Sequence, residues 1–290
     1  MTEQEIEQYF IYHNENIKLL KIGFDNIRDQ IKTLYRTRNK NNDYIFSLTE
    51  TDPEKINHRK LEKALSRLLS GIQVSWAEES IKRLLYERAL FTDSQREYLL
   101  GRSALDQRWY ATLKIVFSIA YDLVPVNDET CDTVDIERKR RNLGDDLVDH
   151  YLELKSIITQ RLVPNFSIRN KVQHGEWEYA FKPKIITHRN RIDSAEFSQE
   201  MTDIINRENI ITTTSRYSLV NAIYQMIVDL GRFKSNSFAL NSIMTPFEYF
   251  YHDYIKKINF EVTKINNPEL DKFIVDYIEK EKHGQQHRQR

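Results

Sequence analysis

The segment 167–181, SIRNKVQHGEWEYAF, gathers the side chains of this chain best suited to acid–base chemistry: Arg169, Asn170, Lys171 and His174. A histidine is the side chain whose ordinary pKa lets it take up and release protons near neutral pH. An arginine carries a permanent charge, and its N–H donors fit a phosphate group. The segment therefore predicts chemistry on a phosphodiester.

The spacing of these residues limits how they can act together. In a helix, Asn170 and His174 lie four residues apart on one face, and Lys171 lies three before the histidine. Arg169 precedes His174 by five residues, which places it about 140° around the helix. One regular helix cannot bring both side chains to one phosphate, whereas a two-fold dimer can place Arg169 of one subunit near His174 of the other.

The pattern of Arg169, a polar residue, three further residues and His174 resembles the signature of the HEPN superfamily. Active members of that family are metal-independent ribonucleases of RNA processing, toxin–antitoxin and anti-phage systems. Asn170 and Gly175 occupy positions where asparagine and glycine are common in the family, and the resemblance covers residues 75–235. HEPN toxins paired with nucleotidyltransferases have a tyrosine two places after the histidine, and Glu176 in this chain argues against that subfamily.

The resemblance implies a role for each residue of the motif. His174 would be the general acid or base at the RNA 2′-hydroxyl or the leaving 5′-oxygen, a contribution of about 10²–10⁴ in rate. Arg169 would stabilise charge on the pentavalent phosphate. Asn170 would orient the imidazole or hold a phosphate oxygen, and Lys171 would bind the RNA backbone. We expect no metal or cofactor, a cyclic phosphate product, and a homodimer whose motifs face one another.

A second interpretation remains open. Arg169 and His174 can instead brace a helix in a bundle that has no catalytic activity. The chain would then be an inactive HEPN-like module that acts as an RNA-binding, sensor or protein-interaction subunit, with its N-terminal helix as the working surface. Either interpretation leaves room for an inhibitory antitoxin or a regulatory protein as a partner.

Composition predicts an all-α protein. The chain has only 7 Gly and 6 Pro in 290 residues, and 30% of its residues are charged, which is typical of long helices and short turns. Lys plus Arg and Asp plus Glu both total 43, so any contact with RNA must come from local clusters of charge. Cys131 is the single cysteine, and the sequence shows no leader and no long apolar stretch. We therefore expect a cytoplasmic protein with no membrane partner.

The N-terminal region, residues 1–74, is expected to contain one long helix over residues 3–38 and a second helix. Apolar residues from Phe10 to Leu34 follow the alternating three–four spacing of a helix that packs lengthwise on a partner. We favour packing on the chain's own second helix over an intermolecular seam. His13 lies in this seam, and we interpret it as a hydrogen-bonded packing residue.

Residues 75–235 are expected to form the HEPN-like bundle, with the apolar segment 109–124 as its central helix, and residues 236–290 a helical extension with a polar tail. Turn and cap residues set the other boundaries. The second helix should begin at Asp52 and Pro53 and end at Gly71, and Ser94 with Glu97 should form a capping box.

Prolines set the expected boundaries of the motif helix. Pro164 should end the helix 145–163, and Pro183 should end the motif helix. Arg169 would then lie near a helix N-terminus, where free backbone amides favour a phosphate. Asp193 and Ser194 should begin a short bridging helix.

A run of cations, Arg138, Lys139, Arg140 and Arg141, lies in the polar segment 126–144, which we expect to be a loop. We interpret the run as a solvated surface, and binding of RNA phosphates is the alternative.

Overall fold

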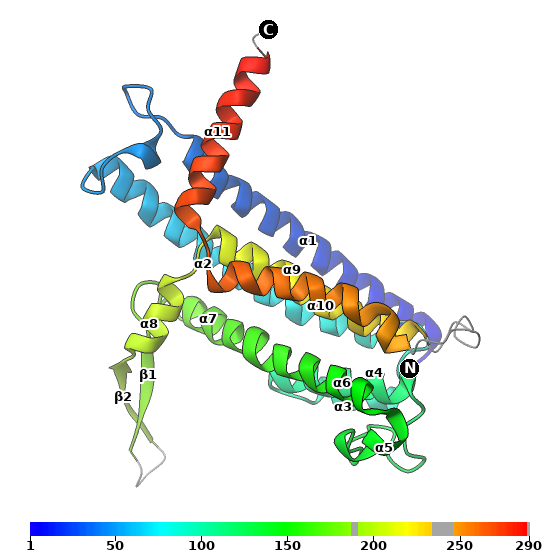
Figure 1. Cartoon of the computed structure of the whole chain (residues 1–290). Coiled ribbons are helices and arrows are strands. Elements are labelled where there is room, and N and C mark those ends of the chain that lie inside the picture. The colour runs from blue at the N-terminus through cyan, green and yellow to red at the C-terminus, as the bar shows by residue number, and fades with distance from the viewer. Residues whose placement is uncertain (187–190, 234–245, 289–290) are drawn as a thin grey trace. The chain divides into compact units, whose positions relative to one another are not determined.

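The computed structural model describes residues 1–186, 191–233 and 246–288, and these residues form the expected all-α helical bundle (Figure 1). None of the described helices combines the length and apolar character that crossing a membrane would require. The longer helices, in chain order, are α1 (Glu3–Arg36), α2 (Pro53–Leu85), α3 (Asp93–Leu100), α4 (Leu105–Ala120), α6 (Asp145–Ile157), α7 (Val163–Gln173), α8 (Gln199–Asn206), α9 (Ile210–Phe233), α10 (Pro246–Asn266) and α11 (Leu270–Arg288). The shorter elements are η1 (Ile45–Ser47), η2 (Glu137–Lys139), α5 (Arg140–Leu143), the π-helical turn η3 (Ile158–Leu162), and the strands β1 (Phe181–Ile186) and β2 (Arg191–Phe197).

The chain divides into two compact units, each assembled from three separate segments. Unit 1 contains Met1–Leu20, Ser75–Phe166 and Arg216–Val262, and unit 2 contains Lys21–Val74, Ser167–Ser215 and Thr263–Arg290. These boundaries follow contacts, whereas the regions 1–74, 75–235 and 236–290 were drawn from sequence patterns. The division into those three regions stays a prediction.

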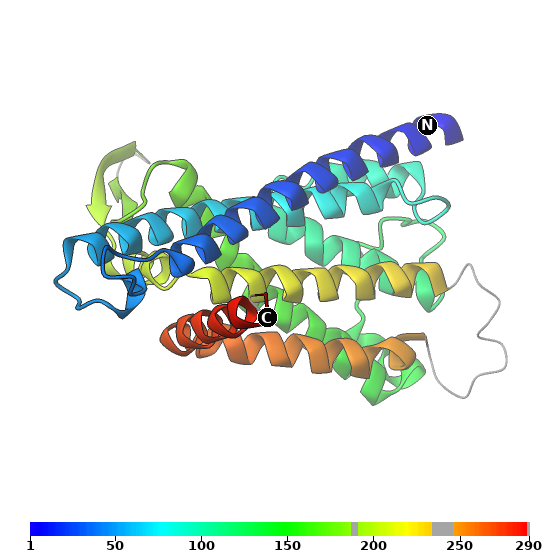
Figure 2. The ribbon, with the colours of Figure 1, turned by 90° about the horizontal axis from the view of Figure 1, so that it is seen from above.

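Helices α1 and α2 form an antiparallel pair, and Figures 1 and 2 show them side by side. In unit 1, His13 Nδ1 and Glu79 Oε1 form a hydrogen bond of 2.6 Å. In unit 2, Tyr35 Oη donates to Glu62 Oε1 at 3.2 Å. The seam residues of α1 therefore pack on the chain's own second helix, which confirms the favoured interpretation and the hydrogen-bonded role of His13.

Two boundaries differ from the sequence predictions. Helix α2 continues through Gly71 to Leu85, because a helical glycine costs only about 1 kcal/mol and buried residues such as Leu69 and Val74 anchor the helix on both sides. The capping box of α3 is formed by Thr92 and Gln95, two residues before the predicted pair. Thr92 accepts from the Gln95 backbone N–H, and the Gln95 side chain accepts from the Thr92 N–H.

The core of unit 1 is built around α4, as its apolar sequence predicts. Trp109 and Phe117 are fully buried, and Phe117 contacts Tyr151 of α6 with ring centroids 4.8 Å apart. Helix α9 packs on α2 through Tyr217 and Trp76, whose ring centroids lie 4.6 Å apart. Within the predicted loop 126–144, η2 and α5 add two short helical turns.

The core of unit 2 combines an aromatic cluster with buried charge. Tyr35 is fully buried and contacts Phe46 of η1 and Phe273 of α11, at ring-centroid distances of 4.9 and 6.2 Å. Arg67 of α2 is also buried, and its Nη2 donates to Asn206 Oδ1 at 2.9 Å. Ser70 Oγ donates to Glu208 Oε2 at 2.6 Å. These polar contacts attach α2 to the end of α8 and the residues that follow it.

A β-hairpin replaces the elements predicted around Pro183 and Asp193. Strands β1 and β2 pair antiparallel, with Phe181 opposite Phe197 and Pro183 opposite Ala195. Pro183 therefore lies within a strand, which a proline tolerates when its strand is an edge, as both strands of a hairpin are. Asp193 lies in β2, and the following helix begins at Gln199, where Ser198 Oγ accepts from the Met201 N–H.

Candidate functional site

The motif residues lie in unit 2 at the C-terminal end of α7, and the backbone there has a defined geometry. The Gly175 N–H donates to Val172 O at 3.1 Å, and the Glu176 N–H donates to Lys171 O at 3.0 Å. Together with the positive φ of 80° at Gly175, these bonds form a Schellman motif in which His174 is the C-cap residue that follows Gln173. Glycine is favoured at 175 because L-residues are strained at this φ.

The prediction that Pro164 ends a helix is wrong. Helices α6 and α7 are joined without a break by the π-helical turn η3, in which the Val163 N–H donates to Ile158 O. A widened turn directly before Pro164 accommodates a residue that has no N–H and whose ring crowds the preceding turn of an α-helix. Pro164 is therefore inside a continuous helical path.

This continuity reverses the electrostatic setting of Arg169. The arginine lies four residues before the end of α7 at Gln173, and not near a helix N-terminus as predicted. The C-terminal end of a helix carries partial negative charge and exposes carbonyl groups. A phosphate at this site must therefore be held by side chains, because no free amides of a helix N-terminus face it.

The three principal motif side chains differ in their surroundings. Arg169 is half-buried, and its Nη1 donates to Gln173 Oε1 at 3.1 Å along the helix. Asn170 and His174 are exposed. Within the described part of the chain, the imidazole of His174 makes no hydrogen bond, so both of its ring nitrogens are open to solvent. The structure thus places Asn170 and His174 on one exposed face at the end of the helix, with Arg169 directed along the helix to Gln173.

Lys171 and Glu176 form a clamp with the backbone of Phe181, which we call the Glu176 clamp. Lys171 Nζ lies 3.1 Å from Glu176 Oε2, and it also donates to Phe181 O. The Phe181 N–H donates to Glu176 Oε2 at 2.6 Å. The clamp attaches the first residue of the hairpin to the motif helix, and it gives Lys171 a structural contact. Its predicted role in RNA binding stays a prediction.

Other contacts hold the segment between His174 and the hairpin. Trp177 Nε1 donates to Val172 O at 2.9 Å, so the indole covers the end of α7. Glu178 accepts from Lys63 Nζ of α2 at 2.9 Å, and this hydrogen bond lowers the pKa of Glu178. The sequence analysis missed these residues. Glu176 follows Lys171 by five positions, a spacing at which two side chains of one continuous helix do not face each other. Their ion pair could be expected only once the helix was known to end between them.

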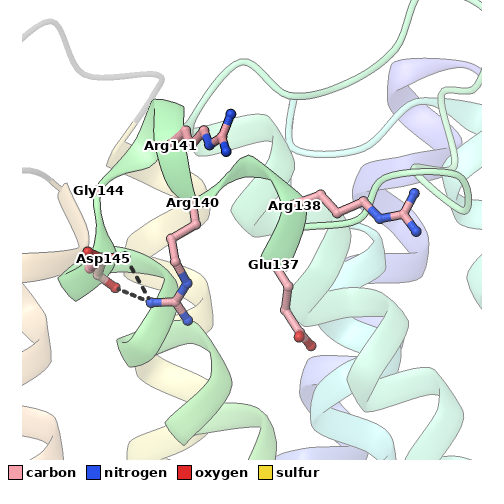
Figure 3. Close-up of a pocket in the computed structure, with 6 residues that line it drawn as sticks. All are labelled: Glu137, Arg138, Arg140, Arg141, Gly144 and Asp145. Atoms are coloured by element: carbon pink, nitrogen blue, oxygen red, sulfur yellow. Dashed lines mark hydrogen bonds and ion pairs between the residues drawn. The ribbon is translucent and has the colours of Figure 1, made fainter.

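The four predicted cations from Arg138 to Arg141 belong to unit 1. Arg138, Arg140 and Arg141 line a cavity of about 510 Å³ together with Glu137, Gly144 and Asp145. Figure 3 shows Arg140 turned toward Asp145, with the side chains of Arg138 and Arg141 directed elsewhere. Arg140 pairs with Asp149 at 2.7 Å and with Asp145 at 3.3 Å, and the hydrogen bond with Asp149 raises the pKa of the guanidinium.

Comparison with known proteins supplies no parallel. No protein-family model, curated protein or solved structure matches this chain. Among the residues that the structure describes, no group of three or more His, Cys, Asp or Glu side chains is arranged to hold a metal ion.

Proposed function

We propose that the chain is a metal-independent endoribonuclease of HEPN type, with Arg169, Asn170 and His174 as its catalytic residues. The observation that carries the proposal is the exposure of His174 at a hydrogen-bonded helix end, five residues after Arg169. A histidine without an internal partner is available for proton transfer, whereas a bracing histidine would be expected to hydrogen-bond within the fold.

The division of labour follows from the positions of the side chains. His174 would remove the proton of the RNA 2′-hydroxyl or protonate the leaving 5′-oxygen. Arg169 would stabilise the charge of the pentavalent phosphate, since its guanidinium lies along the last turn and can exchange the neutral amide of Gln173 for a phosphate oxygen. Asn170, exposed beside them, would hold a phosphate oxygen or the imidazole. The expected product carries a cyclic phosphate.

The proposal includes a homodimer with a shared site. Arg169 is directed along its own helix to Gln173, so a second subunit is one source of an arginine for each His174. Such an enzyme fits the role of a toxin or an anti-phage effector, held inactive by an antitoxin or regulatory partner.

The alternative is a HEPN-like module that binds RNA or protein without cleaving it. The N-terminal seam, its expected working surface, is occupied by α2 of the same chain. The outward face of α1 still exposes apolar side chains such as Tyr12 and Leu19. This face is the surface on which a non-catalytic role would depend.

One experiment separates these functions. Purified protein is incubated with total RNA in excess EDTA, and the 3′ ends of any fragments are analysed for cyclic phosphate. We expect cleavage by the native chain and by His283→Ala, which changes an exposed histidine of α11, and none by His174→Ala. All three proteins should melt within a few degrees of one another, because exposed histidines contribute little to stability. Strict dependence on Mg²⁺ or Mn²⁺ would contradict the mechanism, and unfolding of His174→Ala would support the bracing interpretation.

A further inference from the structure

Three aromatic side chains stand exposed at the base of the hairpin: Tyr179 at 59%, Phe197 at 45% and Phe181 at 40%. The ring centroids of Tyr179 and Phe197 lie 6.3 Å apart, and those of Phe181 and Phe197 lie 6.4 Å apart. The ring planes meet at 60° and 75°, so the rings meet edge to face and are not stacked on one another. We call these three residues the aromatic platform.

The aromatic platform is attached to the motif helix by direct contacts within unit 2. The backbone of Phe181 is bound at both of its polar atoms by the Glu176 clamp, whose lysine belongs to α7. Phe197 is the strand partner of Phe181. Directly beside this pair, the Ser198 N–H donates to Ala180 O at 2.8 Å, and the Ala180 N–H donates to Thr202 Oγ1 at 2.9 Å. The rings are therefore held in a fixed position relative to the end of the helix that bears His174.

We propose that the aromatic platform stacks an unpaired base of single-stranded RNA beside the phosphate acted on at the motif. This inference rests on the proposed function and adds the class of substrate to it. Exposed aromatic rings next to a cationic group are the means by which proteins bind single-stranded nucleic acid, since every base has a face that can stack. Arg169 supplies the cationic group on the adjoining helix.

The arrangement favours a base over a protein surface as the occupant. Rings that meet edge to face leave separate open faces and no flat apolar patch, and a flat base fits such a face. The bases of a duplex are already stacked on one another, so a platform of this kind selects loops, bulges and single strands.

The test uses a short single-stranded 2′-O-methyl oligonucleotide that carries 2-aminopurine, because it cannot be cleaved through a 2′-hydroxyl and its fluorescence falls on stacking. The native chain should bind and quench this probe in EDTA. Tyr179→Ala should weaken binding about 5- to 150-fold, and Tyr179→Phe should bind as the native chain does. Phe197→Leu, which keeps an apolar side chain without a ring, should also weaken binding. Phe260→Leu, which removes a ring 60% exposed on α10, is the matched control and should bind normally.

Several results would overturn the platform. The first is that the native chain does not bind the probe. The second is that Tyr179→Ala and Phe197→Leu bind it as tightly as the native chain does. The third is that duplex RNA competes with the probe as well as single-stranded RNA does. A change in the oligomeric mass of Tyr179→Ala with unchanged probe binding would identify a protein contact instead. Because the probe is not cleaved, the outcome is independent of catalysis. If probe binding depends on the rings but the native chain does not cleave RNA, only the proposed function is rejected. If the native chain cleaves RNA but probe binding does not depend on Tyr179, only the aromatic platform is rejected.

Discussion

The chain has two cationic segments that look similar in sequence and differ in structure. In the segment 138–141, Arg138 pairs with Asp135 at 3.1 Å, and Arg140 pairs with Asp145 and Asp149. Two of its four cations are therefore compensated by carboxylates of the same unit. In the segment 169–174, Lys171 pairs with Glu176 at 3.1 Å, Arg169 donates to the neutral amide of Gln173, and Asn170 and His174 are exposed.

The comparison shows that the density of cations is a poor guide to a phosphate site. A guanidinium engaged by two carboxylates must lose those partners before it can bind a phosphate, and the exchange returns little free energy. A side chain held by a neutral partner or by none can bind the same phosphate at a lower cost. The segment 169–174, which has fewer cations and an exposed histidine, is consequently the better candidate.

The largest effect should come from combining two inactive variants of the motif. Arg169→Ala and His174→Ala should each lose about 10² or more of the cleavage rate. If the site is shared between subunits, a mixture under conditions of exchange should recover part of the native activity, since one intact Arg–His pair forms in each mixed dimer. The measurement is RNA cleavage by isolated heterodimers. No recovery in verified heterodimers, or full activity of a monomer at nanomolar concentration, would end the shared-site hypothesis.

The Glu176 clamp should matter more than the neighbouring ion pair of Glu178. Glu176→Ala leaves both Lys171 Nζ and the Phe181 N–H without this carboxylate, and we expect a loss of about 1–3 kcal/mol in the free energy of unfolding. Glu178→Ala removes a more exposed pair with Lys63 and should cost about 0–1 kcal/mol. Urea denaturation measures both variants. Equal losses would show that the clamp has no special role.

Two glycine substitutions should change stability in opposite directions. Gly175→Ala places a Cβ on a residue with φ of 80° and should destabilise the chain by about 1–2 kcal/mol. Gly71→Ala lies within α2, where the new Cβ meets nothing within 4 Å, and it should stabilise by up to about 1 kcal/mol. Thermal melting compares the two. A stable Gly175→Ala variant would contradict the helix end described for His174.

The buried carboxyl of Glu62 should make stability depend on pH. Burial raises the pKa of Glu62, although hydrogen bonds from Tyr35 and Ser66 act in the opposite direction. The folded state therefore binds this proton more tightly than the unfolded chain. The contribution to stability is full below the ordinary glutamate pKa and is lost as the pH rises through the raised value.

Glu62→Gln cannot ionise and should lack this decline. Its unfolding free energy is measured by denaturation from below the ordinary glutamate pKa to above the raised pKa of Glu62. Above that raised pKa, it should exceed the unfolding free energy of the native chain. Glu54→Gln, an exposed substitution in the first turn of the same helix, is the control and should retain the native pH dependence. A Glu62→Gln variant with the native pH profile would show that another group is responsible.

The smallest effect is expected in the basic segment 138–141. Replacing all four residues by Ser should leave the slope of RNA affinity against salt unchanged, because cations that do not contact RNA phosphates release none of the counterions of the RNA. The measurement is probe binding over a range of salt concentrations. A flatter slope in the variant would assign phosphate contacts to this segment and reverse the comparison.

The features predicted correctly from sequence are those fixed by local apolar spacing. The pattern from Phe10 to Leu34 located α1 and its buried face, and the apolar segment 109–124 located α4. The errors arose where tertiary structure outweighed a local signal. Pro164 continues a helix because η3 widens the turn before it, and Pro183 lies in a strand because its partner strand comes from residues beyond the motif.

The candidate site was predictable in its residue types and not in its surroundings. Arg169, Asn170 and His174 could be chosen from their chemistry and spacing alone. The Glu176 clamp and the aromatic platform could not, because both depend on the chain reversing after Gly175 and on a hairpin that pairs Phe181 with Phe197. Short strands without clear alternation of apolar and polar residues carry little sequence signal.

The interleaved construction of the two units has a consequence for the synthesis of the protein. Unit 1 needs residues up to Val262, and unit 2 needs the segment that starts at Thr263. A nascent chain on the ribosome can therefore complete neither unit until almost all of these residues have emerged, and each unit must close long intervening loops. The motif helix at Arg169 is made well before unit 2 can be finished. An RNA-cleaving activity built this way would appear only after the segment that starts at Thr263 has emerged.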